Sequence, residues 1–438
     1  MVEQWSEEPR VGGSIPSLGT TMKLIPGLRA FASARFRLLV AVLLGAAAIV
    51  RLAALILESY SNMDDFRRLI MVPARLAWRS ISPYHRIGVA LPRQDLGAVG
   101  TFVTPPFMLL LLPWTRLADD PSRAFWIVIE IVAIAVTLLA VYRGIGRPTW
   151  AEGLVAIFLV ALFPPVRDAM QEGQVGLLIS AAMALALLGH QRGRSVLAGC
   201  GLGLVIAIKL TPILVLPYFA YRRDWRLCVS ALATGAAVAL LTLPLGWAHY
   251  WPDFIANVAS AGNGTALVRN QSLNGLLLRA WHPEWNGLPI APLGAGVRAA
   301  WLVLQGTVVA AAAVAVSRGR LAGPVREWAE LSTVLLLTPL VQPYAWEHHW
   351  AQALMVVPVA VCLASRRLLS VKVTIALAAI YALDGLFEYH GYVAANSADP
   401  SVLAHSLGLQ LAASATTITV VVAAILLTTA RSNPARPG

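Results

Sequence analysis

The chain has 438 residues, of which 58% are hydrophobic and 13% are charged. A water-soluble protein of this length could not bury so much apolar surface, so the composition excludes that class and indicates a polytopic membrane protein. The formal net charge is +12, but the 34 basic residues are scattered through short segments. This distribution argues against a nucleic-acid partner and favours topology signals and membrane-lipid headgroups.

Residues 1–36 show no apolar periodicity and are predicted to form a mobile cytosolic tail. The apolar run 37–57 is too long for a signal-peptide core and predicts an uncleaved first span. Basic residues before this run place the N-terminus in the cytosol by the positive-inside bias. We expect one all-α transmembrane domain over 37–430, with about 11–12 spans, outer loops at 58–123 and 248–297, and a cytosolic tail at 431–438.

The first outer loop begins with "SNMDDFRRLI" at residues 61–70. Arg68 and Arg75 share a face of a predicted interfacial helix that is kinked at Pro73, and the short run 104–117 is expected to dip into the outer leaflet. These arginines either face ordinary lipids or hold the phosphate of a lipid substrate. Asp64 and Asp65 either solvate a helix end, hold a cation, or supply a general base.

The apolar stretch 196–221 contains a single lysine, Lys209, in the segment "AIKLTP". We interpret this stretch as a helical hairpin or a pair of broken helices, with Lys209 at the outer turn. A lysine is expensive to bury in a membrane without a partner. A phosphate arriving from the bilayer would satisfy it, and snorkelling to the interface is the alternative.

Three further motifs carry polar groups at predicted outer ends. In "YAWEHHW", the adjacent His348 and His349 lack the H-E-x-x-H zinc spacing, so one could reach a phosphate or sugar while the other packs, or both could belong to an aromatic belt. The amides and hydroxyls of "RNQSLNGLLLR" (269–279) suit hydrogen bonds to a sugar, although a helix cap near Ser272 would look similar. The segment "RDAMQEGQVGLL" is either a cap and loop or a second polar wall.

The middles of the predicted spans are nearly bare of polar residues, apart from Arg51, Glu130 and Lys209. Polar residues gather instead at the outer ends, so the function is expected to face outward. A transporter or flippase of a lipid-linked sugar, the main rival, predicts polar groups along a path between both faces. A structural or assembly protein is the third possibility.

Several pieces, taken in order, resemble glycosyltransferase family 87. They are an aspartate after the first span, "SPY" near residue 83, "TPPF", "GQVGLL", "GLGLVIAIKLTPILVLPYFAYRRDWR", "NQSLNGLLLR" and "QPYAWEHHWAQAL". The resemblance implies a bundle of the glycosyltransferase-C class in a bacterial plasma membrane. It also implies inverting transfer from a polyprenyl phosphate sugar to a glycolipid acceptor on the periplasmic side.

Within the family the chain looks most like polyprenol-phosphate-mannose-dependent α-1,2-mannosyltransferases of phosphatidylinositol mannoside or lipoglycan synthesis. Arabinofuranosyl transfer from polyprenyl phosphate arabinose is the alternative activity. Three departures from the family pattern bear on the sugar. Thr104 stands where the family usually has Tyr, Gly176 stands where it often has Asn, and the tyrosine that commonly follows the aspartate is absent.

The resemblance assigns the general base to Asp65, with Asp64 as the alternative. It implies neither a cofactor nor a metal. The expected donor-phosphate ligands are Lys209, His349, His348, Arg68 and Arg75. The expected contacts to the sugar and acceptor are Gln174, Asn270, Gln271, Tyr84 and Glu347.

Overall fold

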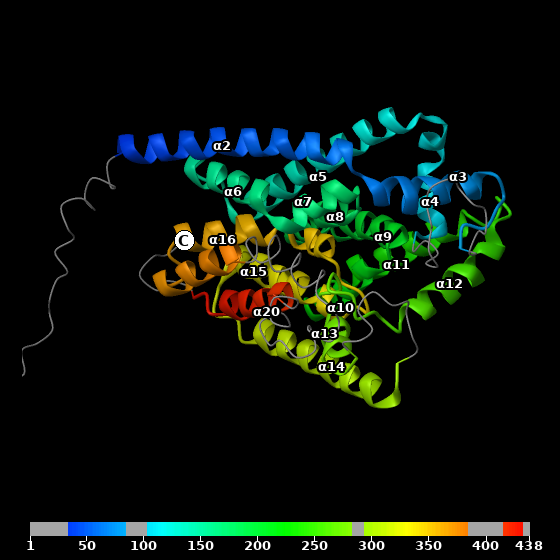
Figure 1. Cartoon of the computed structure of the whole chain (residues 1–438). Coiled ribbons are helices and arrows are strands. Elements are labelled where there is room, and N and C mark those ends of the chain that lie inside the picture. The colour runs from blue at the N-terminus through cyan, green and yellow to red at the C-terminus, as the bar shows by residue number, and fades with distance from the viewer. Residues whose placement is uncertain (1–33, 85–102, 283–292, 384–414, 432–438) are drawn as a thin grey trace, which may run out of the picture.

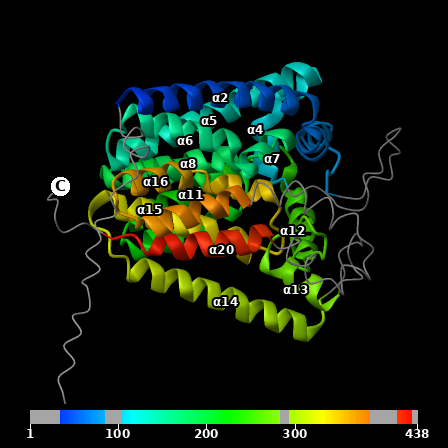
Figure 2. The same cartoon turned by 60° about the vertical axis from the view of Figure 1, so that its left-hand side comes forward.

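The computed structural model describes residues 34–84, 103–282, 293–383 and 415–431, and within these ranges the chain is helical and forms no β-strand beyond an isolated bridge. The long helices lie side by side, with α2 (Ala34–Ser61) and α14 (Ala295–Ser317) at opposite edges (Figures 1 and 2). The predicted all-α class is therefore confirmed. The predicted tails, 1–36 and 431–438, lie almost wholly outside the described residues.

The other elements of the first half are η1 (Phe66–Met71), α3 (Val72–Trp78), α4 (Pro105–Leu111), η2 (Leu112–Arg116), α5 (Asp119–Ile145), α6 (Trp150–Leu162), α7 (Pro164–Glu172), α8 (Gly176–Gln191), α9 (Ser195–Ile208), η3 (Thr211–Val215) and α10 (Leu216–Tyr221). Those of the second half are α11 (Trp225–Leu240), η4 (Trp247–His249), α12 (Tyr250–Ala261), α13 (Leu273–Trp281), α15 (Gly323–Leu337), η6 (Pro339–Val341), η7 (Glu347–Ala353), α16 (Val356–Ser365) and α20 (Ala415–Thr428). A further helix covers Val371–Leu383.

Helix length and composition identify the protein as a multi-pass membrane protein. Three helices, over Leu38–Ser61, Asp119–Ile145 and Ala295–Ser317, are long and apolar enough to cross a bilayer alone. Two bent pairs, α6 with α7 and η7 with α16, pass the same test together, with bends of 56° and 54°. Six shorter apolar helices accompany them among the described residues. The predicted total of about 11–12 spans and the domain boundaries remain predictions.

The bend between α6 and α7 brings a polar helix end against the first outer loop. Pro164 and Pro165 open α7, and α7 ends at Gly173, whose φ of 67° lies in the left-handed region. A Cβ atom on Gly173 would come within 2.5 Å of Cβ of Phe66. Only a glycine therefore allows the end of α7 to lie directly against the first turn of η1.

The apolar stretch 196–221 folds back on itself at Lys209, in agreement with the hairpin interpretation. Ser195, at the start of α9, and Asp224, before α11, are joined by a hydrogen bond of 2.7 Å. Glycines of α9 face α11 along its length, so the two helices run in the same direction. The chain must therefore run back between the end of α9 and the start of α11, and η3 with α10 forms this returning helical segment.

Short elements gather at one end of the bundle, around α3, α4 and α12 (Figures 1 and 2). At seven residues α4 is about 10 Å long, too short to cross a membrane, as predicted for 104–117. The predicted interfacial helix is a π-helical turn, η1, continued by α3, whose first turn contains Pro73. Met71 and Val72 are both helical, so the backbone runs without a break from η1 into α3 and Pro73 lies inside one helical segment. The predicted kink at Pro73 remains a prediction.

Candidate active site

Asp65 lies at the start of η1 and faces the loop after α7. Its carboxylate Oδ2 accepts a hydrogen bond of 2.7 Å from Nε2 of Gln174. The backbone N–H of Met63, two residues earlier, donates to the carbonyl of Gln171 over 2.6 Å. These two bonds, together with the close contact at Gly173, fix the position of Asp65 relative to α7. The predicted site residues Asp65 and Gln174 are therefore brought together.

Asp64 points to different partners. Its carboxylate forms ion pairs with Arg67 at 2.9 Å and with Arg68 at 3.3 Å, both on the next helical turn, and its side chain is 49% exposed. Nε of Arg68 is buried and makes no hydrogen bond within the described ranges. Asp64 thus positions two arginines at the surface of the loop, while Asp65 faces the interior.

Lys209 sits where α9 breaks, in an extended backbone conformation with φ of −147° and ψ of 130°. Asp65 is the carboxylate that acts on it electrostatically, and in the described part of the chain no acidic side chain lies within ion-pair distance. The charge of Lys209 is therefore close to that of Asp65 without being neutralised by direct contact.

Thr104 explains how the broken helix end is held. Its hydroxyl accepts from the backbone N–H of Phe107 over 3.2 Å, which caps α4. The same hydroxyl donates to the carbonyl of Ala207, and the carbonyl of Ile208 lies 3.2 Å away. Because the last carbonyls of a helix lack partners in the helix itself, Thr104 stabilises the end that presents Lys209. This role was not predicted from the sequence.

The two histidines divide their tasks. Nδ1 and the backbone N–H of His348 both lie 3.0 Å from Oδ2 of Asp168 on α7, so His348 is anchored inside the protein. His349 stacks on it, with ring centroids 4.6 Å apart. Nδ1 of His349 lies 3.1 Å from the backbone N–H of Trp346 and 3.3 Å from the carbonyl of Trp346. When Nδ1 accepts from the closer N–H group, the proton of a neutral ring is on Nε2. Lys209 acts electrostatically on His349, so the two predicted phosphate ligands lie near each other.

The departure at Gly176 has a local reason. Gly176 begins α8, and a Cβ atom on it would come within 2.8 Å of the carbonyl oxygen of His348 and 3.0 Å of Cβ of Ala351. Any larger residue, including the asparagine common in the family, would push η7 away from α8. The glycine therefore belongs with the position of the histidine pair.

Arg269 is the centre of a network that sequence reasoning missed. Its guanidinium lies 3.1 Å from Asp168, 3.3 Å from Glu172 and 3.9 Å from Glu347, and it stacks over Trp346 at 5.6 Å. It thereby joins α7, the 263–272 loop and η7. A local signal existed for one part of this network, because Asp168 and Glu172 are spaced i, i+4 and share a face of α7.

The side chains of Asn270 and Gln271 form hydrogen bonds to backbone groups of the protein. Nδ2 of Asn270 donates to the carbonyls of Thr265 and Pro343, and its Oδ1 accepts from the backbone N–H of Ala345 over 3.0 Å. Nε2 of Gln271 donates to the carbonyl of Val268 over 2.7 Å. Both side chains are buried. Their predicted contact with a sugar remains a prediction, whereas their part in joining this loop to 343–345 is evident.

Three other predicted residues hold neighbouring segments. The hydroxyl of Tyr84 donates to the carbonyl of Val103 over 2.6 Å, and burial, reinforced by the carboxylate of Asp253, raises the pKa of Tyr84 above its usual range. Arg75 pairs with Asp119 at 2.9 Å instead of joining the residues around Lys209. Glu347 is buried and acts on Arg279, whose pKa burial lowers to about 10. Arg279 therefore stays charged at neutral pH.

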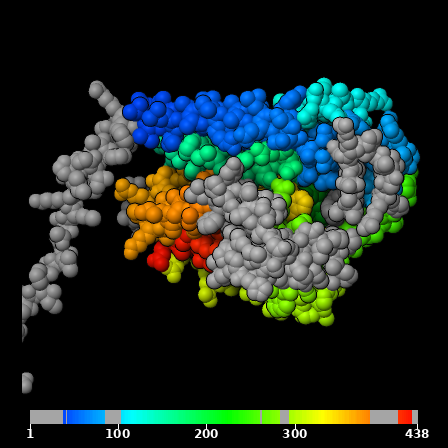
Figure 3. Space-filling view, in the orientation of Figure 1, coloured from blue at the N-terminus to red at the C-terminus, as the bar shows by residue number. Residues whose placement is uncertain are grey.

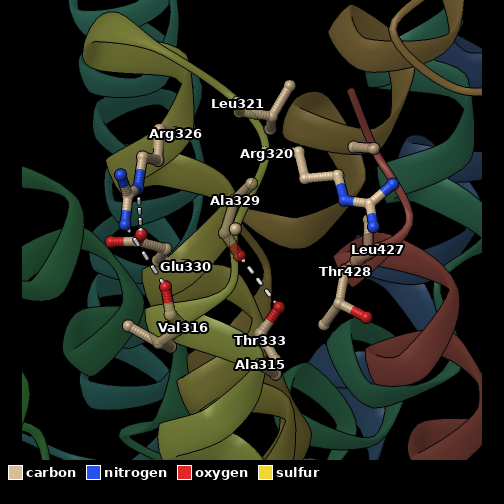
Figure 4. Close-up of a pocket in the computed structure, with 12 residues that line it drawn as sticks. Ala315, Val316, Arg320, Leu321, Arg326, Ala329, Glu330, Thr333, Leu427 and Thr428 are labelled. Atoms are coloured by element: carbon tan, nitrogen blue, oxygen red, sulfur yellow. Dashed lines mark hydrogen bonds and ion pairs between the residues drawn. The ribbon is translucent and has the colours of Figure 1, made fainter. Parts of the chain in front are cut away.

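A pocket lies apart from the residues around Asp65 and Lys209, between α14, α15 and α20 (Figure 4). Arg326 and Glu330 line it and neutralise each other at 2.5 Å. It contains neither a carboxylate beside a free lysine nor a histidine, so it is not the candidate active site. Among the described residues, no three His, Cys, Asp or Glu side chains are grouped to hold a metal.

The cluster of Asp65, Gln174, Lys209, His348 and His349 combines an anchored carboxylate, a cation and a neutral N–H donor in one place. A carboxylate held by one amide can take a proton, and the cation and the N–H group can stabilise a developing anion. We call these five residues the Asp65 site.

Comparison with known proteins identifies relatives. The family model described as glycosyltransferase family 87 matches residues 102–343. A polyprenol-phosphate-mannose-dependent alpha-(1-2)-phosphatidylinositol mannoside mannosyltransferase of Mycolicibacterium smegmatis is 32% identical over 283 residues, which is 60% of this chain and 60% of the relative. The protein of the same description from Mycobacterium tuberculosis is 27% identical over 311 residues, 66% of this chain and 69% of the relative.

A pentamannoside mannosyltransferase of Mycolicibacterium smegmatis is 25% identical over 313 residues, 64% of this chain and 71% of the relative. Among solved structures, ArnT from Cupriavidus metallidurans bound to undecaprenyl phosphate matches with a TM-score of 0.42 and 13% identity, over 87% of this chain and 77% of that one. The matched region spans about 60% of the length of the first mannosyltransferase. Because the family model covers more than half of the sequence, the chain belongs to glycosyltransferase family 87.

Proposed function

We propose that the protein transfers mannose from polyprenyl phosphate mannose to a glycolipid acceptor of the phosphatidylinositol mannoside type, at the outer face of the membrane and with inversion. The activities named for the mannosyltransferase relatives support the donor and the acceptor. The observation that carries the proposal is the hydrogen bond that holds Asp65 near Lys209, which has no ion pair among the described residues.

In the proposed reaction, a hydroxyl of the acceptor gives its proton to the carboxylate of Asp65. The acceptor oxygen forms a bond to the anomeric carbon as the bond from that carbon to the phosphate oxygen breaks. The electron pair of the broken bond leaves with polyprenyl phosphate. Gln174 orients the carboxylate, and Lys209 stabilises the charge that grows on the phosphate.

The two histidines complete the donor side of the proposal. Nε2 of His349 carries the proton of a neutral ring and can donate it in a hydrogen bond to a phosphate oxygen. His348, anchored on Asp168, holds His349 through the ring stack. Arg68, which pairs with Asp64 next to Asp65 and whose Nε makes no hydrogen bond within the described ranges, is the proposed second cation from the first loop.

The test is an assay of the purified protein in lipid, with polyprenyl phosphate mannose and with polyprenyl phosphate arabinose as donors. We expect mannose to be transferred to a phosphatidylinositol mannoside, with an α-1,2 linkage identified by mass and linkage analysis. Transfer of arabinose alone would replace the proposed donor. Movement of the donor across the bilayer without any product would replace the enzyme by a transporter.

A further inference from the structure

A charged cluster with no role in the proposed reaction lies between α2 and α7. Nη1 of Arg51 is 3.0 Å from Oε1 of Glu58, and Nε2 of Gln171 donates to Oε2 of Glu58 over 2.9 Å. Nε of Arg167 lies 4.0 Å from the same carboxylate. Two arginines thus share one glutamate, and the cluster carries a net charge of +1. We call these four residues the Arg51–Arg167 cluster.

The cluster is partly exposed at the surface of α2 and α7. The side chains of Arg51, Glu58 and Arg167 are 26%, 39% and 38% exposed. Val50 and Leu57, which directly precede Arg51 and Glu58 on α2, are exposed hydrophobic residues. Figure 3 shows α2 uncovered along one edge of the molecule. These polar groups therefore adjoin a surface that lipid chains cover in a membrane.

The pairing within the cluster is incomplete. The guanidinium of Arg167 makes no hydrogen bond within the described ranges, and its Nε atom is buried. Nη1 of Arg51 donates to Glu58, which lies seven residues further along α2, about two turns nearer the outer end of the helix. Two arginines that share one carboxylate at a lipid boundary are costly, and a phosphate is an anion that a guanidinium binds with two parallel hydrogen bonds.

The cluster adjoins the Asp65 site on the side away from Lys209. The carbonyl of Gln171 accepts from the backbone N–H of Met63, and the side chain of Gln174 holds Asp65. α2 packs on α5, α6 and α7, whereas α9, which presents Lys209, packs on α4, α8 and α11. A lipid phosphate at Arg51 and a lipid phosphate at Lys209 would therefore lie on different sides of Asp65.

We infer that the Arg51–Arg167 cluster binds the phosphodiester of the phospholipid acceptor, an inference that rests on the proposed function. An inverting transfer needs the acceptor hydroxyl and the leaving phosphate on opposite sides of the anomeric carbon. With the donor phosphate at Lys209, the acceptor enters from the side of α2 and α7. Arg167 and Arg51 then anchor its phosphate at the lipid boundary, and its sugar headgroup extends to Asp65.

The test compares two acceptors in the same assay, a phosphatidylinositol mannoside and an alkyl mannoside that has no phosphate. Arg167→Gln and Arg51→Gln are expected to raise KM for the phosphatidylinositol mannoside about tenfold, because each removes a charge-assisted contact. KM for the alkyl mannoside and KM for the donor are expected to stay unchanged. Glu58→Gln, which removes the competing carboxylate, is expected to lower KM for the phosphate-bearing acceptor.

The matched control is Arg192→Gln. Arg192 is an exposed arginine that directly follows α8, at the end of this helix away from Gly176, and its replacement should leave all three KM values unchanged. Equal losses with both acceptors would assign the cluster a structural role and overturn the inference. A rise in the KM of the donor alone would assign the cluster to the donor and overturn it as well.

Failure of the proposed function has a separate signature, because the wild-type protein would then glycosylate neither acceptor. Native mass spectrometry in detergent then tests the cluster directly, with phosphatidylinositol and uncharged diacylglycerol as probes. Selective retention of phosphatidylinositol by the wild type and its loss in Arg167→Gln would support a phospholipid site. Equal retention by the two proteins would overturn it.

Discussion

The two ends of the bundle both carry charged side chains, but they pair them differently. At one end, Asp224 accepts from Nδ1 of His190 at 2.6 Å, from the hydroxyl of Ser195 at 2.7 Å and from the backbone N–H of Leu227 at 3.1 Å. At the other end, Asp65 accepts a single side-chain hydrogen bond in the described part of the chain, from Gln174.

The basic side chains at the two ends differ in their pairing in the same way as Asp224 and Asp65. Arg222 lies between Glu327 and Glu330, and Arg326 pairs with Glu330, so the charges at the Asp224 end cancel locally. Lys209, near Asp65, has no ion pair among the described residues. A site that binds a charged ligand must keep interactions unsatisfied until the ligand arrives. Completeness of pairing, and not the number of charges, therefore separates the candidate active site from a structural network.

Replacing Lys209 is expected to have the largest effect among the residues that support Asp65. Lys209→Met should lower kcat/KM about 100-fold, because it removes the cation that stabilises the leaving phosphate. We expect weaker use of the donor than of the acceptor, measured by varying each substrate separately. Unchanged KM and kcat for the donor would remove Lys209 from the site.

Gln174 has a counterpart at the other end, and the two can be compared directly. Gln174 bonds to Asp65 at 2.7 Å, and Gln191 bonds to Glu327 at 2.9 Å. Gln174→Leu should lower kcat about tenfold, since one hydrogen bond to a charged group is lost. Gln191→Leu should leave kcat unchanged. Equal kcat values for the two variants would show that Gln174 does not position the base.

Thr104 should show a smaller effect. Thr104→Val keeps the shape of the side chain but removes the hydroxyl that holds the end of α9, so KM for the donor should rise about fivefold. Thr104→Ser restores the hydroxyl and should recover the wild-type KM. A serine variant as weak as the valine variant would mean that the methyl packing matters and the hydroxyl does not.

Arg222 should have the smallest effect on activity. Arg222→Met leaves two carboxylates at the Asp224 end without their shared cation, which should lower the free energy of unfolding by about 3 kcal/mol. Thermal unfolding in detergent measures that loss, and the folded fraction should keep the wild-type kcat. A large fall in kcat of the folded protein would erase the distinction between the two ends.

Local sequence patterns predicted the features that depend on neighbouring residues. A lone lysine in "KLTP", at the centre of an apolar stretch with basic residues at both ends, predicted the turn at Lys209, because a lysine is expensive to bury in a membrane without a partner. The length of the apolar run 104–117 predicted that it does not cross the membrane, and the distribution of polar residues along the chain predicted the polar character of the end where Asp65 lies. The all-helical class followed from the requirement that backbone groups in lipid be paired within helices.

Contacts between distant residues were not predictable in this way. The partners Asp65 and Gln174 are 109 positions apart, and Thr104 and Ala207 are 103 apart. Arg269 joins three segments that share no local pattern. Asn270 was expected at a sugar because amides suit hydroxyl groups, yet its side chain bonds to the backbone on all sides. Residue type indicated polarity, and only the fold determines which polar group meets which.

The central claim is that Asp65, and not Asp64, receives the proton of the acceptor. The most direct test is to measure mannose transfer by Asp65→Asn and Asp64→Asn side by side, after thermal unfolding has shown both to be folded. We expect Asp65→Asn to lose at least about 1,000-fold in kcat. Asp64→Asn should stay within about tenfold of the wild type, because it loses only exposed ion pairs. Full activity in Asp65→Asn would contradict the assignment. Loss of activity in Asp64→Asn together with retained activity in Asp65→Asn would contradict it as well.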